Sequence, residues 1–139
     1  MIWAKCINKS QIAKDKAAFL NRQSEEQVVY CEGEISKSKN GQNTLCCVPL
    51  NLVCDCVKYG TFLAIVRCDV QGEYTDTLPI KAQLATDSQH VIKIFDLNDP
   101  DTIDYIFDMV GDASVVHGGY IGFLSQESQD RFRYRKKNG

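Results

Sequence analysis

Between residues 28 and 96 the chain alternates between short strand-like segments and turn-forming residues, and this spacing constrains the fold more than any other feature. The pair Asn40-Gly41 is the strongest turn signal, because a type I′ turn needs positive φ at both central positions. We therefore expect a hairpin between strands near 28–37 and 43–48. Further turn residues leave strand segments near 52–58, 61–70, 73–84 and 90–96. This spacing predicts an antiparallel meander or a partly closed barrel.

Two amphipathic helices are expected on either side of this region. Residues 10–22 contain neither Gly nor Pro and place apolar side chains near one side. The second helix begins at Asn98-Asp99-Pro100-Asp101, where an acidic cap and an early proline favour a helix start, and it ends at Gly111.

The two ends of the chain complete the predicted fold. We expect residues 1–7 to form a strand, and residues 113–124 to form two short strands around Gly118-Gly119. Residues 131–139 form a basic C-terminal strand or tail in this interpretation. The sequence thus predicts a single α+β domain over residues 1–139, mainly antiparallel sheet with two amphipathic helices.

The composition is that of an ordinary globular domain, with 139 residues, 44% of them hydrophobic and 24% charged. Folding at this size buries about two thirds of the chain surface, so neither a metal nor a disulfide is required for stability. No apolar run approaches the roughly 18 residues that cross a bilayer, and the first residues lack the pattern of an export signal. An odd number of cysteines, seven, then favours reduced thiols. We expect a cytoplasmic protein with no cofactor and no membrane partner.

The cysteines allow two interpretations. Cys46, Cys47, Cys54 and Cys56 would offer four thiolates to zinc if a hairpin brought them together. Adjacent residues of a strand point to opposite faces, however, and the surrounding segments are apolar, which favours core packing. We expect Cys47, Cys54, Cys56 and Cys68 to be mostly buried, reduced and free of metal.

Acidic residues dominate residues 69–112, which carry ten Asp or Glu against two Lys and a formal charge of −8. On the second helix, Asp101, Asp104 and Asp108 lie opposite the apolar stripe, and Asp112 follows its end. Asp104 and Asp108 form a like-charge i, i+4 pair, which implies some compensating interaction. This face is either a solvated surface or a docking surface for a basic protein partner.

The basic segment alternates charge with aromatic side chains: Arg131, Phe132, Arg133, Tyr134, Arg135. In an extended strand, such a strip could stack on bases and neutralise phosphates. The same pattern suits an edge strand whose aromatic side chains complete the core.

Three functions follow, in order of support. The first is a small interaction protein without catalytic activity that docks a basic partner through the acidic helix face. The second is a nucleic-acid-binding module that uses the Arg and aromatic strip. The third is a small enzyme with a site around His117 and Tyr120, because histidine titrates near neutral pH.

Overall fold

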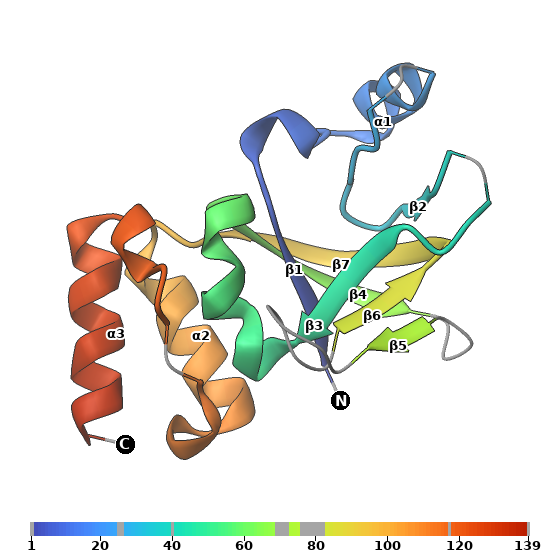
Figure 1. Cartoon of the computed structure of the whole chain (residues 1–139). Helices are drawn as coiled ribbons and strands as arrows, with labels where there is room; N and C mark the ends of the chain where they lie inside the picture. Colours follow the sequence, from blue (N-terminus) through green and yellow to red (C-terminus); the bar gives the residue numbers. More distant parts are fainter. Residues whose placement is uncertain are drawn as a thin grey trace.

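The computed structural model describes residues 2–24, 27–39, 41–68, 73–75, 83–116 and 118–138. Seven strands form one sheet in the order β2-β7-β4-β1-β3-β6-β5, and all neighbouring strands are antiparallel (Figure 1). The strands are β1 (Trp3–Ile7), β2 (Ile35–Lys37), β3 (Leu45–Pro49), β4 (Phe62–Cys68), β5 (Glu73–Thr75), β6 (Gln83–Thr86) and β7 (Ser88–Asp96). The sheet stays open, with β2 and β5 at its edges and the first strand at its centre. The predicted α+β class with a mainly antiparallel sheet is confirmed.

Three α-helices and four 3₁₀ segments accompany the sheet in the described part of the chain. They are α1 (Lys16–Gln23), α2 (Pro100–Val110), α3 (Gln126–Asn138), η1 (Lys9–Gln11), η2 (Leu50–Tyr59), η3 (Asp112–Ser114) and η4 (Ile121–Phe123). The predicted start and end of α2 are confirmed. The Asp99 side chain accepts a hydrogen bond from the Asp101 N–H at 2.9 Å, and Gly111 ends the helix with φ 87°. Within the described residues, no helix is both long and apolar enough to cross a membrane.

The larger core lies on the face of the sheet that carries Ala4 and Cys6. Helices η2, α2 and α3 lie on one side of the sheet, as Figure 1 shows, and their apolar side chains pack against this face. Phe107 of α2 and Phe132 of α3 meet edge to face, with ring centroids 5.5 Å apart. Burial of such aromatic pairs is a main source of stability in a domain of this size.

A smaller core lies on the opposite face, where the sheet curls. Strands β6 and β7 are separated only by Asp87, so they act as one bent ribbon. Its first half pairs with β3 and its second half with β4, which are the two neighbours of β1. Gln89 spans the bend, because its side-chain amide donates to the Leu45 carbonyl at 3.1 Å. The curl therefore brings side chains of β3 and β4, which flank β1, together over one face of the sheet.

The predicted hairpin around Gly41 is wrong. Strand β2 pairs with β7, whereas β3 pairs with β1 and β6, and Asn40 lies outside the described residues. The burial of the two strands explains the difference. Four of the five residues of β3 are buried, which suits an inner position, whereas Ile35 and Lys37 of β2 are exposed at the sheet edge.

Residues 52–58 form part of η2 and not a strand. Leu50, Val53, Cys54 and Val57 are all buried, and their spacing of three and four residues is helical. The alternation of Leu52, Cys54 and Cys56 indicated a strand from the same residues. The structure follows the helical pattern and not the strand pattern, since η2 begins directly after Pro49 and is followed by Gly60.

The two strands predicted for residues 113–124 are also absent from the described residues there, which contain η3 and η4. The predicted helix over 10–22 is shorter, because η1 precedes α1 and Asp15 caps α1 by accepting from the Ala18 N–H at 2.7 Å. Residues 131–138, predicted as a strand or tail, belong to α3. Buried Ser128 and Phe132 lie four residues apart, and the Ser128 hydroxyl donates to the Leu97 carbonyl at 2.6 Å.

Candidate functional site

Three aspartates at and beyond the acidic helix are bound by a single arginine of α3. Arg135 donates hydrogen bonds to Asp104 at 3.0 Å, to Asp108 at 2.8 Å and to Asp112 at 2.7 Å. Arg131 makes a further ion pair with Asp104. We call these five side chains the α2–α3 ion cluster. The cluster supplies the interaction that offsets the repulsion between Asp104 and Asp108.

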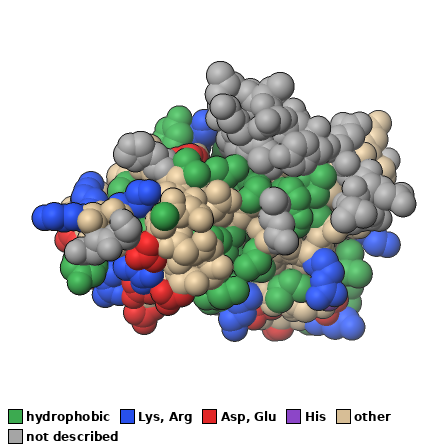
Figure 2. Space-filling view, turned by 90° about the horizontal axis from the view of Figure 1, so that it is seen from below, with side chains coloured by type: hydrophobic (Ala, Val, Ile, Leu, Met, Phe, Trp, Pro, Cys, Tyr) green, Lys and Arg blue, Asp and Glu red, His purple; other side chains and the backbone are tan. Residues whose placement is uncertain are grey.

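The ion cluster occupies most of the predicted acidic docking surface. Asp104, Asp108 and Asp112 contact α3, and the hydrogen bond from Arg135 lowers the pKa of the Asp112 carboxyl. Asp101 lies outside the cluster, exposed on the first turn of α2. Figure 2 shows acidic and basic side chains side by side at the helical end of the molecule. The four aspartates therefore do not form a uniformly negative face.

The predicted Arg and aromatic strip is divided by the helical conformation of α3. Phe132 is buried against Phe107, and Arg131 and Arg135 point to the same neighbour, α2. Arg133 is exposed and bonds to Gln129 within α3 at 3.2 Å. Since a helix distributes successive residues around its axis, these side chains do not form one base-stacking surface.

Tyr120 belongs to an exposed aromatic surface that the sequence alone does not reveal. The ammonium of Lys58 lies 4.8 Å from the centroid of the Tyr120 ring and 5.2 Å from that of Tyr59. The Phe123 ring lies 6.4 Å from Tyr120. We call Lys58, Tyr59, Tyr120 and Phe123 the aromatic surface. His117, the other predicted catalytic residue, lies outside the described residues.

Lys5 is an unusual charged residue, because it lies on the central strand β1 and its amine lies within the curl of the sheet. The amine donates to the Tyr30 hydroxyl at 2.6 Å and to the Gln89 side-chain oxygen at 3.0 Å, and it lies 4.4 Å from the Tyr30 ring centroid. Burial lowers the pKa of Lys5 to about 8, against the opposing effect of nearby thiols. In an alternating strand Lys5 points to the same face as Trp3 and Ile7, so the sequence already indicates that its amine faces inward.

Two cysteines meet near Lys5. The Sγ atoms of Cys47 on β3 and Cys68 on β4 lie 3.0 Å apart, within hydrogen-bond distance for sulfur. Cys47 is buried, whereas Cys68 is partly exposed. The burial predicted for Cys47, Cys54 and Cys56 is confirmed, while Cys68 is more accessible than expected.

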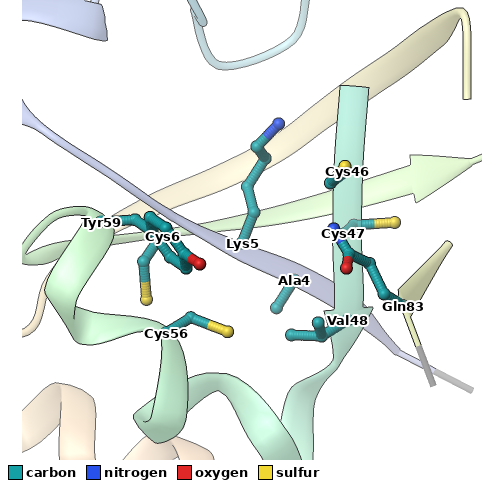
Figure 3. Close-up of a pocket in the computed structure, with 9 residues that line it drawn as sticks. All are labelled: Ala4, Lys5, Cys6, Cys46, Cys47, Val48, Cys56, Tyr59 and Gln83. Atoms are coloured by element: carbon teal, nitrogen blue, oxygen red, sulfur yellow. The ribbon is translucent and has the colours of Figure 1, made fainter. Parts of the chain in front are cut away.

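The four cysteines considered for zinc do not converge. Cys46 and Cys47 both line a cavity of about 270 Å³ with Cys6 and Cys56. Figure 3 shows the Cys47 sulfur pointing away from Cys6 and Cys56. Cys54 is buried, and burial raises its pKa to about 12. Among the described residues, no group of three or more His, Cys, Asp or Glu side chains is arranged to hold a metal ion.

Comparison of the chain with protein-family models, with curated protein sequences and with solved structures gives no significant match. Functional inference therefore rests on the three arrangements described above: the ion cluster, the aromatic surface, and the thiols near Lys5.

Proposed function

We propose that the protein is a macromolecule-binding protein that docks a protein partner through the aromatic surface. The observation that supports this proposal is a group of three exposed aromatic side chains: Tyr59 and Tyr120 lie beside Lys58, and Phe123 lies beside Tyr120. Tyr59, Tyr120 and Phe123 are 52%, 40% and 63% exposed. Tyrosine and other aromatic side chains are enriched at the centres of protein interfaces, where their burial supplies much of the binding energy.

The charge of the aromatic surface indicates the chemistry of the partner. Lys58 sits between two rings and keeps a positive charge at the centre of the surface. A partner that brings apolar side chains to the rings and a carboxylate to Lys58 would complement it. The proposed partner therefore offers an apolar patch with an acidic group, whereas the acidic helix face predicted a basic one.

Two alternatives receive less support. The ion cluster satisfies three of the four aspartates that a basic partner would contact. A nucleic-acid-binding surface needs an excess of positive charge beside its stacking rings. Here Asp55 lies close to Lys58 along η2 and accepts from the Gly119 N–H at 3.3 Å, and the whole chain carries a net charge of −2.

The test is a comparison of matched variants with one purified partner. A protein captured from a lysate of the source cell by the tagged wild type is purified, and its affinity is measured by calorimetry. Tyr59→Ser combined with Phe123→Ser should weaken binding by at least about tenfold. Leu20→Ser, which changes a side chain 58% exposed on α1, should leave the affinity unchanged. Circular dichroism checks that each variant is folded.

The alternatives predict different results. Equal affinity of the aromatic variant together with a loss for Asp101→Asn would assign docking to the acidic helix and contradict the proposal. Salt-sensitive binding of single-stranded RNA or DNA that the aromatic substitutions abolish would make this surface a nucleic-acid site instead. Self-association that disappears in the aromatic variant would identify a second copy as the occupant and contradict a separate partner.

A further inference from the structure

The pairing of Cys47 with Cys68 follows from the curl of the sheet. Their strands, β3 and β4, lie on opposite sides of β1 in the strand order. The bent β6–β7 ribbon joins both strands, since Leu45 pairs with Thr86 and Cys68 pairs with Gln89. The Sγ–Sγ separation of 3.0 Å is therefore determined by the pairing of the strands and not by the conformation of a loop.

The surroundings of the two sulfurs differ in a way that gives them different roles. Cys47 is 2% exposed, whereas Cys68 is partly exposed at the end of β4. With Cys47 as donor, the hydrogen bond between them lowers the pKa of Cys68 and raises that of Cys47. The ammonium of Lys5 adds to the lowering at Cys68, and burial opposes it.

The geometry points to a hydroperoxide-reactive thiol pair in which Cys68 is the attacking sulfur and Cys47 is the resolving sulfur. This site is independent of the aromatic surface and goes beyond the docking function proposed above. Its substrate class is a hydroperoxide, either hydrogen peroxide or a small alkyl hydroperoxide. Lys5 acts as a positioning residue, because its charge favours the thiolate without contacting the peroxide.

The chemistry proceeds in two balanced steps. The Cys68 thiolate attacks the outer oxygen of ROOH, the O–O bond breaks, and Cys68 becomes a sulfenic acid while RO⁻ leaves and takes a proton from water. The Cys47 thiol then attacks the sulfenic sulfur, which forms the Cys47–Cys68 disulfide and releases water. Two thiols are oxidised by two electrons in total, and one peroxide is reduced to an alcohol and water.

Other cysteines are less suited to this reaction. Burial raises the pKa of Cys54 to about 12 and that of Cys56 to about 11, so their thiolates are scarce at neutral pH. Cys46 is adjacent to Cys47 and, like Cys68, is partly exposed. Its side chain lies on the opposite face of β3 from Cys47, because successive residues of a strand point to opposite faces. Cys46 is therefore the matched control for position and exposure.

The experiment exposes the folded, reduced chain to a few equivalents of hydrogen peroxide, blocks remaining thiols by alkylation, and maps disulfides by mass spectrometry without reduction. The expected product has lost two hydrogen atoms and carries a cross-link between the peptides of Cys47 and Cys68. Cys46→Ser should form the same cross-link at the same rate. Cys68→Ser should form no cross-link at Cys47, and Cys47→Ala should leave a dimedone-reactive sulfenic acid on Cys68.

The role of Lys5 is tested by measuring the rate of peroxide consumption. Lys5→Met should slow peroxide consumption at pH 7 by about tenfold, with the loss recovered as pH is raised, because one pKa unit changes the thiolate fraction tenfold. Wild-type protein that still has seven free thiols after peroxide treatment, counted by alkylation in denaturant, would overturn the proposal, whatever the variants do. A cross-link that excludes Cys68, or equally fast oxidation of Cys46, would do so as well.

Discussion

Arg135 contacts Asp112 through two nitrogen atoms, Nε at 3.3 Å and Nη2 at 2.7 Å from its carboxylate oxygens. This two-point contact joins α3 to the segment directly after α2, and the same guanidinium lies 5.2 Å from the centroid of the Phe107 ring. Two-point arginine–carboxylate contacts fix orientation as well as distance. The ion cluster therefore restrains the orientation of α3 against α2.

Arg135→Gln should lower the free energy of unfolding by about 1 to 2 kcal/mol, because three carboxylates lose a shared partner and repel one another. Urea unfolding followed by circular dichroism measures the change. Arg133→Gln is the matched control, since Arg133 is exposed and bonds within α3, and its effect should stay within about 0.5 kcal/mol. Equal effects of the two substitutions would show that Arg135 contributes no more to stability than an exposed arginine of α3.

The ion cluster should also weaken in acid. The pKa of Asp112 is lowered below its ordinary value of 3.8, so its contribution is present above that pH and is lost as pH falls through the lower folded value. Thermal unfolding of the wild type and Asp112→Asn should differ at pH 6 and converge as pH falls below the ordinary value. A difference that is constant down to pH 2 would contradict the assignment.

Lys5 should change stability in the same direction as Asp112, rising with pH, but in the alkaline range. Its folded pKa of about 8 lies below the ordinary value of 10.5, so the unfolded chain binds more protons between these values and stability rises with pH there. Titrating cysteines and tyrosines add their own terms, so the measured quantity is the wild-type free energy of unfolding minus that of Lys5→Met, under reducing conditions. This difference should increase from pH 8 to pH 10. A flat difference would place the amine in water.

Gly60 directly follows η2, and its replacement should strongly destabilise the protein. A Cβ atom there would lie 2.1 Å from the carbonyl carbon and oxygen of Ile7, which are backbone atoms of β1. Gly60→Ala should therefore destabilise the protein by about 2 to 3 kcal/mol or more. Gly122→Ala, with no atom within 4 Å of the new Cβ, should change stability by less than about 0.5 kcal/mol. Denaturant midpoints of the two variants make the comparison.

Local signals predicted α2 correctly, because Asp99, Pro100 and Gly111 act through neighbouring backbone atoms that the sequence already specifies. The same local signals failed for η2, where Leu52, Cys54 and Cys56 alternate like a strand while Val53 and Val57 follow a helix. The packing of η2 against β1 and α2 favours the helical pattern.

Contacts between residues far apart in the sequence were harder to predict. The charges of Asp104 and Asp108 implied a compensating partner, but nothing in the local pattern identified Arg135, because α3 is polar and buries few apolar side chains. The contact of Lys58 with Tyr120, and that of Cys47 with Cys68, depend on the layering and the curl of the sheet. Neither pair follows from spacing along the chain.

The central position of β1 has a consequence for how the chain reaches this structure. Trp3 pairs with Pro49 on one side and with Val66 on the other, so two long loops must close before the middle of the sheet exists. Refolding should accordingly take on the order of milliseconds to seconds, with β3 and β4 unpaired along one edge during that time. Their cysteines are then open to scrambled disulfides, and recovery of native protein from denaturant should depend on a reductant.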